Sequence, residues 1–316
     1  MGQRRRRSEA KHTGRARRKA SAKLATRLTP TPSPEDTTRE RYEALVETLP
    51  LDVDTYRPKM REDIFLALNR VAAHKPNGPL PEGAKVHSKD IAKATGTTPL
   101  PAEVPRVLGI TGFSRSGKDT VPNYLLRTYA GVTLFAYSDP IIDEVNIFLT
   151  PHGYHIDQES KTEPHFRHLL QIFGSGRRYE DPDYWNTPII ETVRGLRDAG
   201  TRLTIISGLR FTVGPDTGEI SDRDLTTVYA VEGEIWNVDR PGLQDSGVAA
   251  HYNEAGLATM GPKDFDGWLV NGVEGDLAAC YENLEALLRD EKQPHIPVGY
   301  PYTAEQLWEF ARRLRS

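Results

Sequence analysis

Two glycines and a lysine in the middle of the chain have the spacing of a phosphate-binding loop. Gly112, Gly117 and Lys118 follow the G-x-x-x-x-G-K pattern shortly after the apolar pair at 107–108. Glycines at these positions let backbone N–H groups approach a polyphosphate, and the lysine can reach its β- and γ-phosphates. A helix expected from about residue 117 would add its positive dipole end. The residues expected to bind ATP are Gly112, Ser114, Arg115, Ser116, Gly117, Lys118, Asp119 and Thr120.

Asp119 departs from the common form of this pattern. It stands where Ser or Thr usually contacts the metal ion, and Thr120 follows one place later. A carboxylate is a hard oxygen ligand, so we expect Asp119 and Thr120 to hold Mg²⁺ directly or through water. The competing interpretation of the whole stretch is a glycine turn between a strand and a helix, without any role in phosphate binding.

Charge is distributed unevenly along the 316 residues. The formal net charge is −3, yet the charged residues of positions 1–28 are all Lys and Arg except Glu9. A Thr/Pro/Ser-rich run at 29–34 follows, and neither part can bury enough apolar surface to order itself. We therefore predict a disordered basic arm over 1–35. It either contacts nucleic acid or another polyanion, or it is a solubilising tail.

Hydropathy and cysteine content bear on location. The sequence has no apolar run of membrane-spanning length, and no hydrophobic stretch follows the basic N-terminus. We expect a cytoplasmic protein with no membrane contact. The single cysteine, Cys280, lies at helical spacing from Leu284 and Leu287, which predicts a buried thiol rather than a catalytic one and excludes an intrachain disulfide.

Residues 36–104 are predicted to form a small helical region and a linker. The helical patterns cover 38–49, 61–73 and 88–94. In the last of these, Ser88 has the character of an N-cap and Gly96 that of a C-terminal stop. This segment is either one helix of a DNA-binding helix-turn-helix or a helical appendage without a chemical role. The second is favoured, because no partner helix with base-reading residues is evident.

From about residue 106 the pattern alternates strands and helices, which predicts an α/β fold with a mostly parallel sheet and helices on both faces. The predicted strands cover 106–111, 132–136, 202–206, 227–231, 235–238 and 267–270. The predicted helices cover 117–129, 139–149, 163–173, 184–199, 274–290 and 303–314. This order places the glycine-rich loop at the carboxyl edge of the first strand, where open α/β sheets bind ligands.

Further motifs follow the loop in a defined order. They are Tyr137-Ser138-Asp139-Pro140, Arg167-His168-Leu169-Leu170-Gln171-Ile172-Phe173-Gly174, Asp183-Tyr184-Trp185, Ile205-Ile206-Ser207-Gly208-Leu209-Arg210, Val238-Asp239-Arg240-Pro241-Gly242, His251-Tyr252-Asn253-Glu254-Ala255-Gly256-Leu257 and Val270-Asn271. Together with the loop, this series resembles the phage-type deoxynucleoside monophosphate (dNMP) kinases over about 106–290.

The resemblance implies a P-loop NTPase fold over 105–292, a three-layer αβα sandwich with a lid, followed by a C-terminal helix within 293–316. It implies transfer of the γ-phosphate of ATP, with Mg²⁺, to a dNMP. The stretch from Arg240 to Leu257 resembles the lid over the phosphates. Within it, His251 and Glu254 lie at an i, i+3 spacing and are expected to cap a lid helix or to pair with each other rather than to take part in the reaction.

Five residues are expected to bind the acceptor. Arg167 and Gln171 lie one helical turn apart and can hold its phosphate and base. The resemblance assigns Gly174 to the dNMP pocket and Arg210 to the phosphate, and Trp185 can stack on the base or sugar. Four of them have an alternative: a surface ion pair for Arg167, a helix-ending turn for Gly174, core packing for Trp185 and a solvated loop for Arg210.

Catalysis is assigned to Lys118, Arg210, Asp139 and Arg240. Asp139 would orient the acceptor or a metal-bound water, although a role as N-cap beside Pro140 explains it well without any part in catalysis. Arg240 either approaches the transferring phosphoryl group or stays solvated.

One position departs from the family pattern. Gly208 stands where the family usually carries a polar or acidic residue near the metal, and 219–226 reads as an inserted loop. Two other functions therefore stay open: a kinase of another small phosphate acceptor, such as dephospho-coenzyme A or phosphomevalonate, and a nucleotide-sensing protein that binds nucleic acid. The oligomeric state is open as well, with a homodimer among the options.

Overall fold

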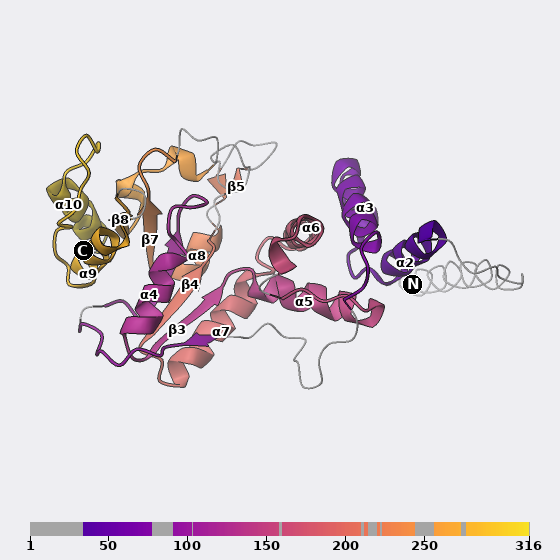
Figure 1. Cartoon of the computed structure of the whole chain (residues 1–316), viewed down its shortest axis with the longest axis horizontal. Helices are drawn as coiled ribbons and strands as arrows, with labels where there is room; N and C mark the ends of the chain where they lie inside the picture. Colours follow the sequence, from indigo (N-terminus) through magenta and orange to yellow (C-terminus); the bar gives the residue numbers. More distant parts are fainter. Residues whose placement is uncertain are drawn as a thin grey trace, which may run out of the picture.

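The computed structural model describes residues 34–77, 91–102, 104–157, 160–209, 212–213, 220–221, 223–243, 256–272 and 276–315. In these parts of the chain we find an α/β structure with nine α-helices and a six-stranded, mostly parallel sheet (Figure 1). A separate antiparallel pair joins β5 (Thr212–Val213) to β6 (Ile220–Ser221). The predicted α/β class with a mostly parallel sheet is confirmed.

The six strands of the main sheet lie in the order β1-β3-β4-β2-β7-β8. They are β1 (Ala92–Lys93), β2 (Val107–Thr111), β3 (Val132–Ala136), β4 (Leu203–Ser207), β7 (Glu234–Asp239) and β8 (Gly267–Val270). All neighbouring pairs are parallel except β1 and β3. The chain builds β3 and β4 on one side of β2 and then crosses to β7 on the other side. The carboxyl end of β2 therefore lies at the switch in strand order where open α/β sheets bind ligands.

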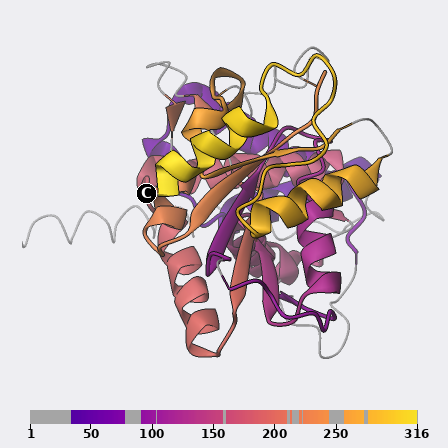
Figure 2. The same cartoon turned by 90° about the vertical axis from the view of Figure 1, so that its left-hand side faces the viewer.

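Helices cover both faces of the sheet. On one face, α4 (Thr120–Thr128) and α9 (Leu277–Leu288) bury their apolar residues against the strands. On the other face lie α7 (Asn186–Asp198), α8 (Arg223–Tyr229) and α10 (Ala304–Arg315). Figure 2 brings the C-terminal helices, orange to yellow, toward the viewer. Every residue of β2 is buried between these layers, so the position of its carboxyl end is fixed by packing on both faces.

Four helices form a second packed group beside the sheet. They are α2 (Pro34–Thr48), α3 (Pro58–Ala72), α5 (Asp139–Leu149) and α6 (Pro164–Glu180). The last three each carry a proline at the first or second helical position, where the missing N–H costs no hydrogen bond. Helices α2 and α3 lie beyond α5 and α6, away from the sheet (Figure 1).

The N-terminal helices share a core with α5 and α6. On α3, Ile64, Leu68 and Val71 are at most 1% exposed, which confirms the predicted apolar face of this helix. They belong to the same buried cluster as Phe166 and Phe173 of α6. Burial of this size is a main source of stability, so α2 and α3 are part of the packing that holds α6 in place.

The predicted strand at 227–231 is wrong, because Arg223–Tyr229 forms the helix α8. The run of Thr, Val and Tyr there has high strand propensity, but the helix buries Val228 directly over β2. A Cβ at Gly109 of β2 would lie 3.0 Å from a Val228 methyl group. Close packing of the helix on a glycine in the sheet therefore overrides local propensity.

The predicted helix at 88–94 is also wrong over its described part. Ala92 and Lys93 form the edge strand β1, which pairs antiparallel with Leu134 and Thr133 of β3. As a strand, this segment forms hydrogen bonds to the exposed edge of the sheet. A short isolated helix would be less stable, because helices of this length are marginal in water. The helix-turn-helix interpretation needs a helix at this place, so it is wrong as well.

Two further expectations concern the burial of Cys280 and the presence of membrane-spanning segments. The Cys280 side chain is fully buried, as predicted, and burial raises the pKa of its thiol to about 11. Within the described ranges, none of the helices has the length and apolar character needed to cross a membrane.

Candidate active site

The glycine-rich loop after β2 is packed so tightly that only glycine fits at its two key positions. Gly112 and Gly117 have φ angles of +147° and +102°. A Cβ at Gly112 would lie 2.6 Å from the carbonyl oxygen of Val238, and a Cβ at Gly117 would lie 2.5 Å from Nδ2 of Asn271. Both glycines are therefore required by the backbone conformation and by close approach of β7 and β8.

The helix after the loop begins later than expected. Its first residue is Thr120 rather than a residue near 117, and the Gly117 carbonyl accepts hydrogen bonds from the N–H groups of Thr120 and Val121 at 2.9 and 3.1 Å. Asp119, just before the helix, has an exposed carboxylate (80%), whereas the Lys118 side chain is only 13% exposed. The Lys118 Nζ lies 3.7 Å from Oδ2 of Asp119. The lysine side chain is thus mostly buried, and its ammonium group lies beside a hard oxygen ligand.

Asn271, directly after β8, holds the loop in place through hydrogen bonds. Its Nδ2 donates a hydrogen bond of 2.6 Å to the Ser116 carbonyl, and its own N–H donates to the Asp239 carbonyl at 2.7 Å. The Ser116 side chain is fully buried, and its Oγ has no hydrogen-bond partner among the residues that the structure describes. A buried hydroxyl of this kind is costly unless a ligand or water satisfies it, which makes Ser116 a candidate contact for a bound group.

A cavity of about 200 Å³ opens beside the loop. It is lined by Arg115, Gly117, Asp119, Thr120, Arg240, Asn271, Asp276 and Leu277. Arg240 follows β7, and its Nη1 donates to the carbonyl of Arg115 at 3.3 Å across the mouth of the loop. Leu277 adds an exposed apolar wall at the start of α9. The cavity thus combines two arginines and two aspartates with one apolar side chain beside the loop.

A buried carboxylate at the end of β7 was not predicted as a site residue. Asp239 is 7% exposed, and its Oδ2 accepts a hydrogen bond of 2.5 Å from the Tyr300 hydroxyl, which in turn accepts one from Trp268 Nε1 at 2.7 Å. Burial raises the pKa of Asp239, although the Tyr300 hydrogen bond opposes this. The sequence carries no local signal for this contact, because Tyr300 lies 61 residues away.

On the other side of β2, Asp139 closes the turn between β3 and α5. Its Oδ2 accepts a hydrogen bond of 2.8 Å from the Ala136 N–H, and the side chain is 8% exposed. The N-cap of α5 is Ser138, so Asp139 lies in the first helical turn rather than at the cap. It remains at the carboxyl edge of the sheet, where the predicted role as an active-site carboxylate would place it.

The acceptor residues predicted on α6 differ in their surroundings. Arg167 is exposed and Gln171 is half-buried. Gly174 lies inside the helix, so the helix-ending turn is wrong there, and a Cβ would lie 3.1 Å from Cδ1 of Ile141 on α5. Trp185 is 2% exposed and donates from Nε1 to the Gly174 carbonyl at 3.0 Å. These contacts favour the core-packing interpretation of Trp185 over stacking on a base.

Arg178 is a second residue that the sequence did not single out. Its Nη2 lies 2.6 Å from Oδ1 of Asp224, a nearly fully buried carboxylate on α8. The guanidinium also lies over the ring of Tyr137, 5.6 Å from its centroid, just after β3. The Tyr137 hydroxyl donates to Oδ1 of Asn186 at 2.8 Å. A half-buried arginine is therefore positioned at the carboxyl edge of β3 by Asp224 of α8 and by Tyr137, which is itself held by Asn186 of α7.

Several predicted residues lie outside the described part of the chain. These are Arg210 and the lid residues His251 and Glu254. Gly208, two positions before Arg210, has a φ of +80°, so a side chain there would be opposed by backbone strain.

Two oxygen-bearing side chains of the loop, Asp119 and Thr120, are the predicted metal ligands. Among the residues with described positions, no group of three or more His, Cys, Asp or Glu is arranged to hold a metal ion. Mg²⁺ is commonly bound by one or two protein oxygens, with phosphate oxygens and water completing the shell, so Asp119 and Thr120 fit that pattern.

Comparison of the sequence with models of known protein families finds no match, and a search of curated proteins finds none either.

Proposed function

We propose that this chain is a phosphotransferase that moves the γ-phosphate of ATP to a deoxynucleoside monophosphate. The observation that carries the proposal is the glycine-rich loop at the carboxyl end of β2. Its glycines are forced by close approach of Val238 in β7 and of Asn271 directly after β8, and the Lys118 Nζ lies 3.7 Å from Oδ2 of Asp119. A loop of this kind, followed by a helix, presents N–H groups and a positive dipole end to phosphate oxygens.

The residues around the loop fit ATP as the donor. The two glycines let the backbone make the tight turn that such a loop needs, and the buried Ser116 hydroxyl lacks a partner within the described structure. The cavity beside the loop offers Arg115 and Arg240 near the phosphates and Leu277 farther out for a base. Mg²⁺ bound through Asp119 or Thr120 would neutralise charge that develops on the transferring phosphoryl group.

The acceptor is expected on the β3 and β4 side of the loop. Tyr137, Asp139 and Arg178 lie at the end of β3, and the Thr111 hydroxyl at the end of β2 donates to the Leu209 carbonyl at 3.3 Å, which ties this side to the loop. Arg178, whose charge is paired with Asp224, can add a hydrogen-bond donor for an acceptor phosphate, and Asp139 can orient the attacking oxygen. Phosphoryl transfer needs mainly such positioning and charge neutralisation, not covalent catalysis. The choice of dNMP as acceptor rests on the ordered motifs of the sequence.

A panel of acceptors tests the proposal. ADP release from ATP and Mg²⁺ is measured with dGMP, dTMP, dCMP, dAMP, dephospho-coenzyme A and phosphomevalonate, each against a reaction without acceptor. We expect at least one dNMP to stimulate release. Lys118→Ala should lower that rate on the order of a thousandfold, because a cation at the transferring phosphate is lost.

The matched control is Lys93→Ala, which removes an exposed lysine from the edge strand β1 and should keep the wild-type rate. Stimulation only by one of the two other acceptors would redirect the assignment to that substrate. Absence of any stimulated release, or full activity in Lys118→Ala, would contradict it.

A further inference from the structure

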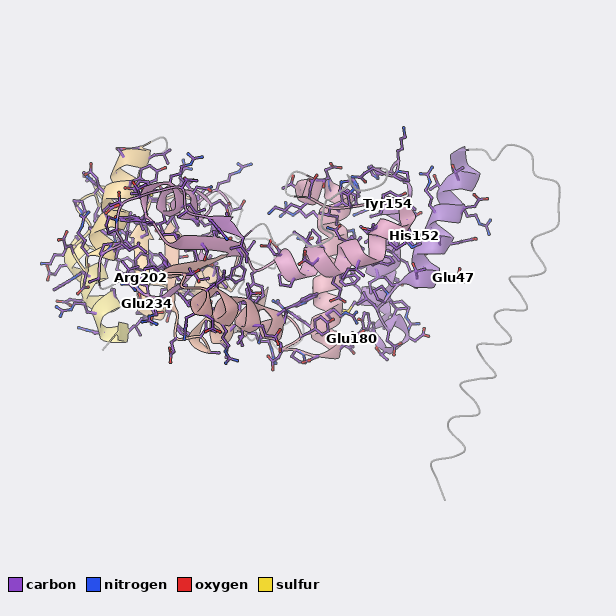
Figure 3. The ribbon with its side chains drawn as sticks, turned by 90° about the horizontal axis from the view of Figure 1, so that it is seen from below. Glu47, His152, Tyr154, Glu180, Arg202 and Glu234 are labelled. Carbon is purple, nitrogen blue, oxygen red and sulfur yellow. The ribbon has the colours of Figure 1, made fainter. Side chains whose placement is uncertain are left out.

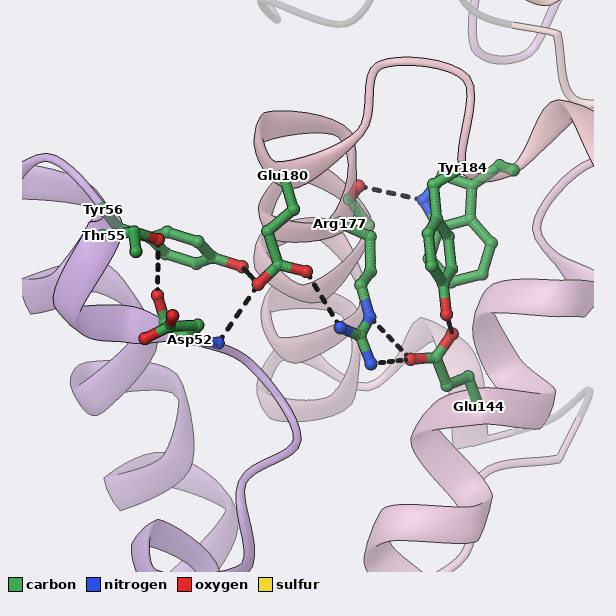
Figure 4. Close-up of polar contacts among 9 residues, drawn as sticks. Asp52, Thr55, Tyr56, Glu144, Arg177, Glu180 and Tyr184 are labelled. Atoms are coloured by element: carbon green, nitrogen blue, oxygen red, sulfur yellow. Dashed lines mark hydrogen bonds and ion pairs between the residues drawn. The ribbon is translucent and has the colours of Figure 1, made fainter. Parts of the chain in front are cut away.

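A chain of polar contacts joins α5 and α6 on the acceptor side of the proposed site (Figure 4). Arg177 of α6 donates to Oε1 of Glu144 on α5 from Nε at 2.7 Å and from Nη2 at 2.5 Å. The other oxygen of Glu144 accepts from the Tyr184 hydroxyl at 2.9 Å. The guanidinium also lies over the Tyr184 ring, 5.0 Å from its centroid. Arg177 is therefore fully engaged in joining the two helices and the turn before α7.

The same chain continues into the N-terminal region. Arg177 Nη1 donates to Oε2 of Glu180 at 2.9 Å, and Oε1 of Glu180 accepts from the Tyr56 hydroxyl at 2.6 Å and from the Asp52 N–H at 3.1 Å. Figure 3 shows Glu180 at the end of the molecule that holds the N-terminal helices, opposite Arg202 and Glu234 on the sheet side. One carboxylate thus links the segment before α3 to the helix that carries the predicted acceptor residues.

Shape complementarity reinforces the polar chain. Gly176 faces the N-terminal segment, and a Cβ there would lie 3.0 Å from the Tyr56 hydroxyl and 3.3 Å from Cδ1 of Leu51. Tyr56 is only 4% exposed. The segment between α2 and α3 therefore touches the backbone of α6 in the turn that follows Gly174.

Partial burial makes these contacts stronger than surface ion pairs. The side chains of Arg177, Glu144 and Glu180 are 16%, 20% and 24% exposed. Burial alone would raise the pKa of Glu180, but hydrogen bonds from Tyr56, Arg177 and the Asp52 N–H outweigh it and lower the pKa. Glu180 is thus ionised at neutral pH, and charge-assisted hydrogen bonds of this kind are stronger than neutral ones.

We propose that the segment from Leu51 to Tyr56 is a positioning element for the acceptor helix. Through Glu180 and Arg177 it fixes α6 against α5, so that Arg167, Gln171 and Arg178 on α6 and Asp139 on α5 keep their relative positions. This inference rests on the proposed kinase function, and it gives residues outside the kinase-like stretch a role in acceptor binding. Tyr56 and Glu180 act through α6 and do not contact substrate themselves.

The test replaces one hydroxyl and uses a matched control. Tyr56→Phe removes the donor to Glu180. Tyr129→Phe removes an equivalent donor, a 3% exposed tyrosine whose hydroxyl lies 2.6 Å from both oxygens of Glu285, at the far end of α4. We expect Tyr56→Phe to raise KM for the dNMP about tenfold while KM for ATP stays the same, and Tyr129→Phe to change neither. Glu180→Gln, which removes the charge facing Arg177, should act in the same direction.

Hydrogen exchange of the α6 amides supplies a readout that does not depend on activity. It should be faster in Tyr56→Phe than in Tyr129→Phe if the segment holds α6. Equal α6 exchange in the two variants, or wild-type KM for the dNMP in both Tyr56→Phe and Glu180→Gln, would overturn the proposal. If the wild-type protein shows no dNMP-dependent turnover, the kinase assignment fails instead, and the exchange data alone then decide whether the segment holds α6.

Discussion

Gly117→Ala is the substitution whose effect the structure defines most sharply. A Cβ at this position lies 2.5 Å from Nδ2 of Asn271, and the backbone has a φ of +102°, which alanine rarely adopts. Holding a non-glycine residue in such a conformation costs about 1–3 kcal/mol. Displacing the buried Asn271 amide breaks its 2.6 Å hydrogen bond to the Ser116 carbonyl, for about 1–3 kcal/mol more.

We therefore expect Gly117→Ala to lower the free energy of unfolding by about 2–6 kcal/mol, measured by equilibrium urea denaturation. Because the loop itself moves, ATP affinity measured by calorimetry should fall at least about tenfold, which corresponds to about 1.4 kcal/mol. The control is Gly195→Ala in the last turn of α7, where a Cβ meets no atom of the described residues within 4 Å. That variant should be more stable than wild type by about 0.5–1 kcal/mol.

A double-mutant cycle separates the two costs. Asn271→Ala removes the atom that the new Cβ would meet, so Gly117→Ala should cost less in that background than in the wild type, by about 0.5–3 kcal/mol. The free-energy cost of the positive φ at residue 117 is present both in the wild type and in Asn271→Ala. Additive effects would show that the amide clash is absent. A Gly117→Ala protein with the stability and the ATP affinity of the wild type would refute the described loop geometry.

Two further predictions concern titrating groups. Burial lowers the pKa of His152, His165 and His168, which lie where α2 and α3 meet α5 and α6, so the folded chain binds fewer protons than the unfolded chain. Their contribution to stability is complete above about pH 7 and decreases as the pH falls through about 6.5, and equal urea midpoints at pH 8 and pH 5.5 would contradict this sign. Tyr300→Phe removes the hydroxyl that donates to the buried Asp239, and it should lower the free energy of unfolding at pH 8 by about 1–3 kcal/mol. An unchanged urea midpoint would show that this hydrogen bond contributes nothing.

The loop geometry could be predicted because its requirements are local. The spacing of Gly112, Gly117 and Lys118 after a short apolar strand specifies where the backbone must turn and where a phosphate can approach. The positive φ angles at both glycines agree with that expectation. Strands and helices with clear periodicity were located equally well, apart from boundary shifts such as the start of α4 at Thr120 rather than near 117.

The errors arose where tertiary contacts decide the local structure. Residues 223–229 have strand-like composition in their second half, yet they form a helix because Val228 packs on Gly109 of β2. Ala92 and Lys93 follow a helix-like cap but pair with β3 instead. In both cases a partner far away in the sequence determined the outcome, and no local pattern reveals such a partner.

Several site residues were missed by the sequence analysis for the same reason, because their contacts lie far away in the sequence. Arg178 depends on Asp224, 46 residues away, and Asn271 contacts Ser116 across 155 residues. Tyr56 and Glu180 are separated by 124 residues, so the role of the N-terminal helices in holding α6 could not be read from either segment alone. These contacts follow from strand order and helix packing, which pairwise spacing in one sequence does not specify.

The most direct test of the central claim follows the phosphate itself. ATP labelled at the γ-phosphate is incubated with the protein, Mg²⁺ and each dNMP, and the products are separated by anion-exchange chromatography. The account predicts that label moves from ATP to a deoxynucleoside diphosphate with wild-type protein and not with Lys118→Ala. Label that stays in ATP, or that appears only as free phosphate with every dNMP, would contradict the claim that this chain is a dNMP kinase.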